Sequence, residues 1–243
     1  MTKDANLSVS GEKPDKKKTS KSIDHDFKIN DKAAIRELFL LAALWMPLGF
    51  FIWFKFGPIF VRLNAILSSW VLQWVMPAAI SGISQVQHIL EINTLIPDAT
   101  LHQGRVALQV VTVNPMIYGY GIPLLLGLVM ATPRLSILQR AAQLMGGYLV
   151  LVCVQTWGVF WEVLKDMSFA LGPYATQAVA ETGIPNTLIA LCYQLGYLML
   201  TPIAPLVVWI VFNRNFLEHI TTGRERKVKP KQNLQAPVSS KVE

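Results

Sequence analysis

The sequence has few of the side chains on which disulfide-bonded, metal-binding and nucleic-acid-binding proteins depend. Cys153 and Cys192 are the only cysteines among 243 residues, and both fall inside apolar runs. A disulfide framework is therefore not indicated, and no Cys/His spacing matches a metal site, so we expect no metal and no cofactor. Basic residues crowd the two ends, where aromatic residues are sparse. That distribution argues against nucleic-acid binding.

The chain is instead rich in apolar residues, which make up 52% of it and come in long runs. Such runs predict a multi-pass membrane protein. The first run follows a charged tail, so we expect an uncleaved anchor within residues 37–56. Three further spans are expected in residues 116–212, as a helical bundle. The apolar runs themselves cover residues 38–54, 116–132, 141–163 and 184–212. The polar, basic tails, residues 1–36 and 213–243, are expected to be disordered.

Residues 57–80 leave two interpretations open. Apolar side chains recur there at helical spacing, among them Ile59, Ile66, Trp70 and Trp74, while Arg62 and several polar residues occupy other positions. This pattern favours an amphipathic helix that lies in the membrane interface. The segment is also long enough to cross the membrane.

Two alternating segments follow, residues 84–96 and 104–113, and predict a small β-hairpin. The expected apolar faces carry Val86, Leu90, Ile92 and Ile96 in the first strand, and Val106, Leu108 and Val110 in the second. A lone hairpin is only marginally stable in water. We therefore expect its apolar face to rest on the 57–80 helix or on the membrane surface.

Residues 114–123 connect the second expected strand to a membrane helix. Asn114-Pro115 ends the strand, and Gly119 permits backbone conformations closed to other residues. Tyr118 and Tyr120 have the amphipathic rings that suit a membrane–water boundary. We interpret this segment as the joint between a small extramembrane β unit and the helices. The alternative is an ordinary loop whose tyrosines belong to an aromatic belt.

The basic residues indicate an orientation. Of the 22 Lys and Arg residues, 18 lie in residues 1–36, 133–140 and 213–243. The positive-inside rule places all three segments in the cytoplasm. Four spans satisfy that rule if the 57–80 helix does not cross. Both termini would then be cytoplasmic, and residues 57–115 would lie on the outer side.

The sequence offers no convincing catalytic residue. Cys153 lies near the middle of its span, where a thiolate is poorly solvated, and Cys192 has no His or charged partner in its own span. His88 and His102 fall in the hairpin region. An intramembrane cysteine-dependent enzyme is therefore an alternative without a defined site. A small transporter or channel subunit is a further alternative, which the scarcity of ionisable residues in the spans disfavours.

Binding of a partner is the remaining class of function. A hairpin with a free edge can accept a peptide as an added strand. Aromatic and amide side chains at the outer ends of the spans are candidates for contact with a partner: Asn114, Tyr118, Tyr120, Gln155, Trp157 and Trp161. The alternative is that Trp157 and Trp161 anchor a helix at the membrane boundary, and that Gln155 hydrogen-bonds between helices.

Residues 114–123, the run Gln155-Thr156-Trp157-Gly158-Val159 and Leu164-Lys165 together resemble the exosortase H-associated membrane proteins. The resemblance spans roughly residues 36–215. It implies a small protein of the Gram-negative inner membrane, encoded beside an exosortase, a transpeptidase-like membrane enzyme that processes proteins with a C-terminal sorting helix. The family supplies no catalytic residues to carry over. The chain does not resemble an exosortase itself, because it lacks the Cys, Arg and His set and has about half the spans.

The sequence thus predicts a membrane α-helical fold with about four transmembrane helices, an interfacial amphipathic helix and a small outer-side β-hairpin. The predicted function is that of a non-enzymatic accessory subunit of a protein-sorting or envelope-export system, which engages the sorting enzyme or its substrate. The expected partners are membrane lipids and a membrane protein, and no nucleic acid.

Overall fold

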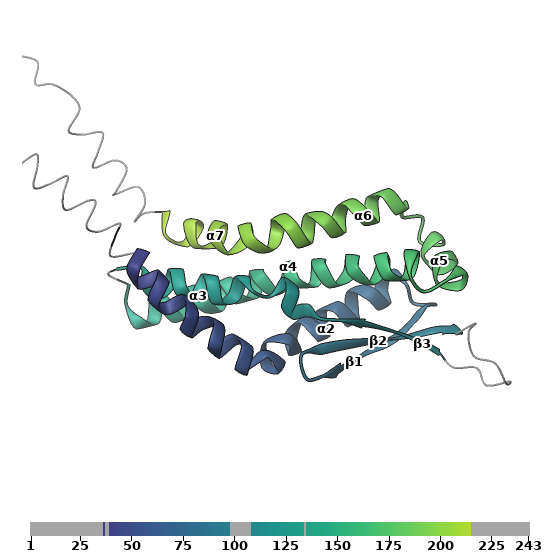
Figure 1. Ribbon diagram of the computed structural model, residues 1–243, viewed down its shortest axis with the longest axis horizontal. Helices are drawn as coiled ribbons and strands as arrows, with labels where there is room; N and C mark the ends of the chain where they lie inside the picture. Colours follow the sequence, from purple (N-terminus) through teal and green to yellow (C-terminus); the bar gives the residue numbers. More distant parts are fainter. Residues whose placement is uncertain (1–35, 37–38, 98–107, 134, 215–243) are drawn as a thin grey trace, which may run out of the picture.

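The computed structural model describes residues 36, 39–97, 108–133 and 135–214, which form an elongated, mostly helical molecule with one small sheet (Figure 1). The helices are a first helix, Phe39–Lys55, then α2 (Gly57–Val75), α3 (Gly121–Ala131), α4 (Ile137–Phe169), α5 (Pro173–Ala180), α6 (Asn186–Gln194) and α7 (Thr201–Phe212). The strands are β1 (Ile80–Val86), β2 (Ile89–Pro97) and β3 (Leu108–Val113). A 3-10 turn, η1 (Pro115–Tyr118), precedes α3, and a π-helix, η2 (Leu195–Leu200), links α6 to α7.

Two helices are long and apolar enough to cross a membrane: α4, and the continuous run of α6, η2 and α7. A third candidate arises if the first helix and α2, which are bent by 67° relative to each other, count as one broken span. The turn η1 and helix α3 together form a shorter apolar helix, Pro115–Ala131. The expected fold of apolar helices is thus confirmed, with two or three candidate spans, while the fourth span stays a prediction.

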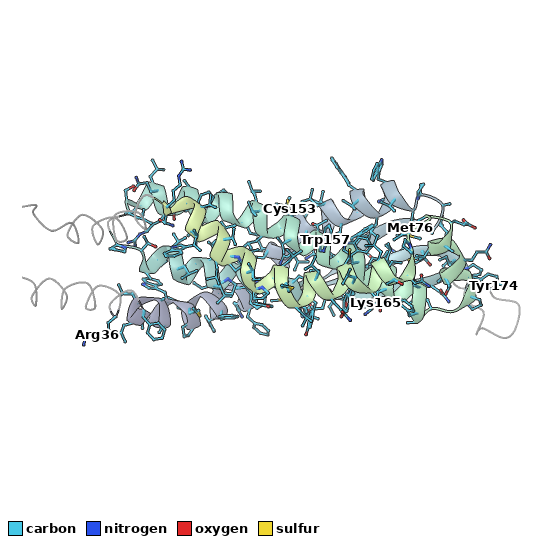
Figure 2. All side chains as sticks on the ribbon, turned by 90° about the horizontal axis from the view of Figure 1, so that it is seen from above. Arg36, Met76, Cys153, Trp157, Lys165 and Tyr174 are labelled. Carbon is cyan, nitrogen blue, oxygen red and sulfur yellow. The ribbon has the colours of Figure 1, made fainter. Side chains whose placement is uncertain are left out.

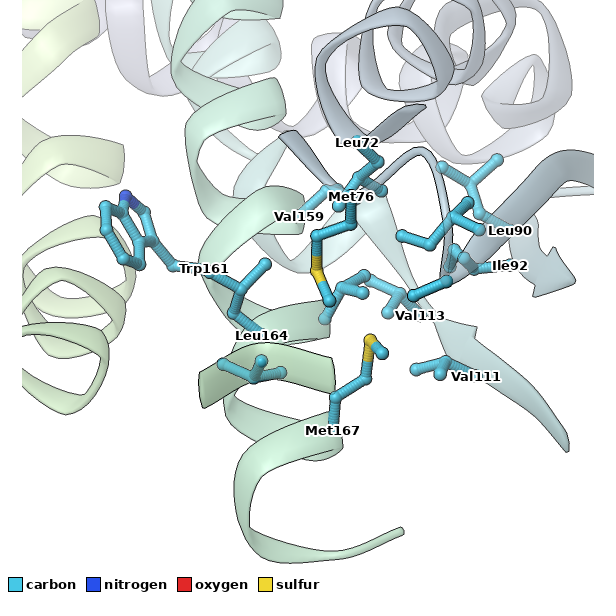
Figure 3. Close-up of a cluster of buried hydrophobic side chains, with 14 of the residues drawn as sticks. Leu72, Met76, Leu90, Ile92, Val111, Val113, Val159, Trp161, Leu164 and Met167 are labelled. Atoms are coloured by element: carbon cyan, nitrogen blue, oxygen red, sulfur yellow. The ribbon is translucent and has the colours of Figure 1, made fainter. Parts of the chain in front are cut away.

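The molecule divides along α4 into two halves, each with its own core. The bundle half consists of the first helix, α3, α7 and the beginning of α4, and its core contains Ile122, Leu125, Val129, Leu151 and Val208. The α/β half consists of α2, the sheet, α5, α6 and the end of α4. Figure 3 shows its core, where Met76, directly after α2, Ile92 of β2 and Met167 of α4 converge. The apolar face of the sheet rests on α2, as expected, and also on α4.

The sheet has three antiparallel strands in the order β1–β2–β3. The expected antiparallel pair is present as β2 and β3, but the sheet has a third strand, β1, that was not expected. Residues 84–96 are not one strand, because the chain reverses at Gln87 and His88 between β1 and β2. Gln87 has a φ of 57°. The turn uses neither Gly nor Pro, and the apolar alternation runs through it, so the pattern contained no signal for a reversal. β2 shows the expected face, with Leu90, Ile92 and Ile96 buried.

The predicted apolar face of the last strand is also wrong. Val111 and Val113 are buried, whereas Leu108 and Val110 are 50% and 49% exposed. Both faces of β3 carry apolar side chains, so alternation alone could not choose between them. The pairing of Val111 with Ile92 on β2 sets which face meets the core. Val106 lies outside the described residues.

Helix α2 turns two of its polar side chains inward. Asn64 and Ser68 are fully buried, and Asn64 Nδ2 donates to Thr156 Oγ1 of α4 at 3.1 Å. The aromatic side chains Trp70 and Trp74 point outward. Figures 1 and 2 show α2 running beside the end of α4 along the long axis of the molecule. This is not the direction of a helix lying flat in an interface that α4 crosses, and the interfacial position stays a prediction.

Candidate functional site

Residues 114–123 join β3 to α3, as the sequence predicts. The Asn114 side chain accepts a hydrogen bond from the Met116 backbone N–H at 3.1 Å, and Pro115 occupies the first helical position of η1. Both are residues that favour a helix start. The turn then directs the Tyr118 ring onto Gly158 of α4, where an added Cβ would overlap the ring. The sheet and the helices are therefore joined by a close backbone-to-ring contact.

Next to this contact, side chains from η1, α4, α6 and η2 form a group that we term the tyrosine–lysine cluster. Its members are Tyr118, Trp157, Glu162, Lys165, Tyr193 and Tyr197. The Tyr193 and Tyr197 rings stack with centroids 6.1 Å apart, and Tyr118 meets Tyr197 edge-on at 6.3 Å. Lys165 Nζ lies 4.5 Å from the centroid of the Tyr193 ring. Such ring pairs and cation–π contacts contribute about 0.5–1.5 kcal/mol each.

The cluster lies where α4 becomes charged. No charged residue separates Arg140 from Glu162, and Lys165 and Asp166 follow within the next turn. Lys165 Nζ pairs with Asp166 Oδ1 at 2.9 Å, and both side chains are partly exposed, so this pair adds little stability. The Glu162 carboxylate lies near Tyr118. The cluster thus combines aromatic surface with charge at one level of the molecule.

Five buried polar atoms of α4 have no hydrogen-bond partner among the described residues: Arg140 Nε, Gln155 Oε1, Trp161 Nε1, Glu162 Oε2 and Ser168 Oγ. Unpaired buried polar groups are costly and uncommon in folded proteins. Two of the five, those of Gln155 and Glu162, are seven residues apart and so share one face of α4. Three of the five lie between residues 155 and 162, beside the tyrosine–lysine cluster.

The π-helix η2 brings Tyr197 to this cluster. Thr201 Oγ1 donates to the Gly196 carbonyl at 2.8 Å, and Pro202 and Pro205 follow, neither of which has a backbone N–H. A Cβ on Gly196 would lie 3.1 Å from Trp157 Cδ1, so the π-helix approaches α4 closely. Wide turns of this type often occur at functional sites.

The six residues proposed as partner contacts gather around η1 and α4 but differ in exposure. Tyr118, Gln155 and Trp161 are buried within the chain, Asn114 and Tyr120 are half-buried, and Trp157 is 39% exposed. The three buried side chains pack within the joint and are not accessible to a partner. A direct contact with a partner therefore stays a prediction mainly for Trp157. Sequence reasoning did not select Tyr193 and Tyr197. Their spacing of four residues in an apolar run was the available signal.

The cysteines and histidines considered for a cysteine-dependent enzyme do not form a site in the described part of the chain. Cys153 is exposed on α4, and Cys192, which is partly buried, offers only its backbone carbonyl to Trp157 Nε1 at 3.4 Å. His88 lies in the β1–β2 turn, next to Gly57. Within the described ranges, no three His, Cys, Asp or Glu side chains are grouped as metal ligands would be. His102 lies outside the described residues.

Comparison with known proteins gives one match. The family model described as exosortase H-associated membrane protein matches residues 32–216, which include every described residue. No curated protein and no solved structure matches the chain. The matched segment is well over half of the 243 residues and contains both the joint and the tyrosine–lysine cluster. The chain therefore belongs to the family of exosortase H-associated membrane proteins.

Proposed function

We propose that this protein is a non-enzymatic accessory subunit of an exosortase-type protein-sorting system, which engages the sorting enzyme or its substrate in the bacterial inner membrane. Membership of the family links the chain to an exosortase system. The observation that carries the accessory role is the partly exposed tyrosine–lysine cluster. Tyr197 is 43% exposed and Trp157 is 39% exposed, and aromatic side chains of this kind dominate the energetics of protein–protein contacts.

The proposal places the bundle half in the hydrocarbon core. The first helix and the Pro115–Ala131 helix have 17 residues each, or about 25 Å at roughly 1.5 Å per residue. That length is close to the core of a bilayer, about 30 Å. With 33 residues, or about 50 Å, α4 extends well beyond this layer. The α/β half packs against the excess length and would lie on the outer side.

Contacts at one end of the bundle support this orientation. Arg140 Nη2 donates to the Thr132 carbonyl at 3.3 Å, and Trp209 Nε1 donates to Thr132 Oγ1 at 2.9 Å. Gln143 of α4 and Asn213, directly after α7, exchange two side-chain hydrogen bonds. The start of α4 and the end of α7, which carry Arg140 and Arg214, therefore belong to the same end, at the left of Figure 1. Figure 2 shows Arg36 at the left as well. The positive-inside rule makes that end cytoplasmic, with both termini.

Co-purification from the native host tests the accessory role. We expect the tagged wild-type protein to capture the exosortase expressed with it, and Tyr197→Ala to reduce the captured fraction at least tenfold. Tyr174→Ala is the matched control, because Tyr174 is an equally exposed tyrosine on α5, outside the cluster. Absence of the exosortase and of its sorting substrates from the wild-type eluate would refute the accessory role. If the Tyr197→Ala variant captured as much exosortase as the wild type, the contact with the exosortase would lie outside this cluster.

A further inference from the structure

Arg140, near the start of α4, carries a positive charge at the end of the bundle half. The acidic side chains of the described chain all lie in the α/β half: Glu91, Glu162, Asp166 and Glu181. The nearest of them along α4, Glu162, is 22 residues from Arg140, or about 33 Å at roughly 1.5 Å per residue. Within the described ranges, Arg140 forms no ion pair.

The guanidinium of Arg140 uses few of its donors within the described chain. Its Nη2 donates to the Thr132 carbonyl at 3.3 Å, and its Nε is buried without a hydrogen-bond partner among the described residues. A guanidinium carries five N–H donors in a rigid planar fork, which matches the oxygens of a phosphate group. The bond to Thr132 fixes the side chain at the end of α3, so the fork is held in place before a ligand binds.

Apolar surface lies on both sides of Arg140 along α4. Ile137 and Leu138, just before it, are 88% and 80% exposed, and Met145, five residues after it, is 63% exposed. Residues 141–161 contain no charged side chain. These neighbours place Arg140 at the boundary between lipid tails and headgroups. A charged group at that depth is costly unless an opposite charge neutralises it.

The groups around Arg140 also suit that boundary. Trp209 of α7 donates from Nε1 to Thr132 Oγ1 at 2.9 Å, so its indole lies beside the same end of α3. Tryptophan is enriched at the level of the headgroups. The charged residues described at this end, Arg36, Arg140 and Arg214, are all basic. A basic site between membrane helices at this level suits the phosphate of a lipid headgroup.

We infer that Arg140, held at the end of α3 beside Trp209, binds the phosphate group of an anionic phospholipid. The phosphate oxygens accept hydrogen bonds from the guanidinium, and the phosphate supplies the negative charge that the described chain does not place there. A phospholipid suits the site better than an acidic residue of a partner protein, because the site lies at the depth of the phospholipid phosphates. The inference is independent of the exosortase and requires only that the bundle half lies in a membrane.

Lipid retention tests this site. The full-length protein is purified in detergent with phosphatidylglycerol, and the bound lipid is counted by native mass spectrometry. We expect Arg140→Gln to lower the retained phosphatidylglycerol at least fivefold. Arg214→Gln is the matched control, because it removes the same charge from an exposed side chain at the same end, and it should retain lipid as the wild type does. Undiminished retention by Arg140→Gln, or equal losses in both variants, would overturn the inference.

Thermal unfolding separates lipid binding from a purely structural role of Arg140 as a cap on α3. A ligand that binds the folded state raises the unfolding midpoint. Phosphatidylglycerol should therefore raise the wild-type midpoint by several degrees more than phosphatidylcholine does, and Arg140→Gln should lose this difference. If Arg140→Gln lowered the midpoint equally in both lipids, the role would be structural and the inference would be wrong. An equal rise with inorganic phosphate would assign the site to free phosphate and overturn the lipid assignment.

A charge-conserving variant keeps the inference testable if Arg140→Gln does not fold. Arg140→Lys retains the charge but lacks the planar fork. Its retention of phosphatidylglycerol should fall at least twofold, whereas Arg214→Lys should retain lipid as the wild type does. Equal retention by the two lysine variants would contradict a phosphate held by the guanidinium.

Discussion

At the scale of single residues, the joint between sheet and helices depends on positions where only glycine fits. A Cβ on Gly158 would overlap the Tyr118 ring, and a Cβ on Gly119 would overlap the Gln155 side chain. The two contacts bind η1 to α4 from both sides. The sequence identified this segment as a joint from its Pro, Gly and Tyr residues. It could not show that Tyr118 would be buried, because an interfacial tyrosine and a packed one have the same sequence pattern.

Gly158→Val should therefore destabilise the fold. We expect a loss of about 1–3 kcal/mol in the free energy of unfolding, because the tightly packed ring of Tyr118 must move. The measurement is unfolding in detergent, followed by tryptophan fluorescence. Gly146→Ala in the same helix is the control, since its Cβ would meet only the mobile end of Phe212, at 3.3 Å. Combining Gly158→Val with Tyr118→Ala should recover part of the loss; no recovery would argue against the ring contact.

At the scale of elements, the sequence predicted helices more reliably than strands. Long apolar runs became helices, because length and composition are sufficient signals for a membrane helix. The strand pattern failed at two points: the β1–β2 turn lacks a turn residue, and β3 is apolar on both faces. In each case long-range pairing, which a local pattern does not contain, decided the structure. The inward polar face of α2 escaped prediction for a related reason, since periodicity reveals two faces but not which one is buried.

Two nearby residues of β2 lie on opposite faces of the sheet and should differ in how much they contribute to stability. Ile92 is fully buried against α2 and α4, whereas Leu95 is 49% exposed on the opposite face. Ile92→Ala should cost about 2–5 kcal/mol through lost burial and a cavity. Leu95→Ala should cost less than about 1 kcal/mol, because little buried area is lost. Thermal unfolding of the two variants side by side gives the comparison. Equal losses would contradict the burial of the Ile92 face of β2.

At the scale of the whole molecule, the arrangement separates charge from apolar surface. Among the described residues, the bundle half has charged side chains only at its ends, while Arg62, Glu91, Glu162 and Glu181 lie in the α/β half. The two cores follow the same division. The sequence placed Lys and Arg at the ends of the expected spans, and the orientation that follows from the positive-inside rule stays a prediction. The sequence could not anticipate that the end of α4 packs into the α/β half, which only its contacts reveal.

The layout predicts which residues an impermeant thiol reagent reaches from outside intact cells. With Cys153 and Cys192 replaced by serine, single cysteines at Val86 in β1 and Gln177 in α5 should be labelled. A cysteine at Ser136, which caps α4 at the opposite end, should be labelled only after lysis. The result does not depend on whether the first helix alone or the bent pair with α2 forms the first crossing, because both paths bring β1 to the outer side. Protection of Val86 with labelling of Ser136 would mean that the whole molecule is inverted in the membrane. The α/β half would then face the cytoplasm, and the proposed contact surface would be on the wrong side for an exported substrate.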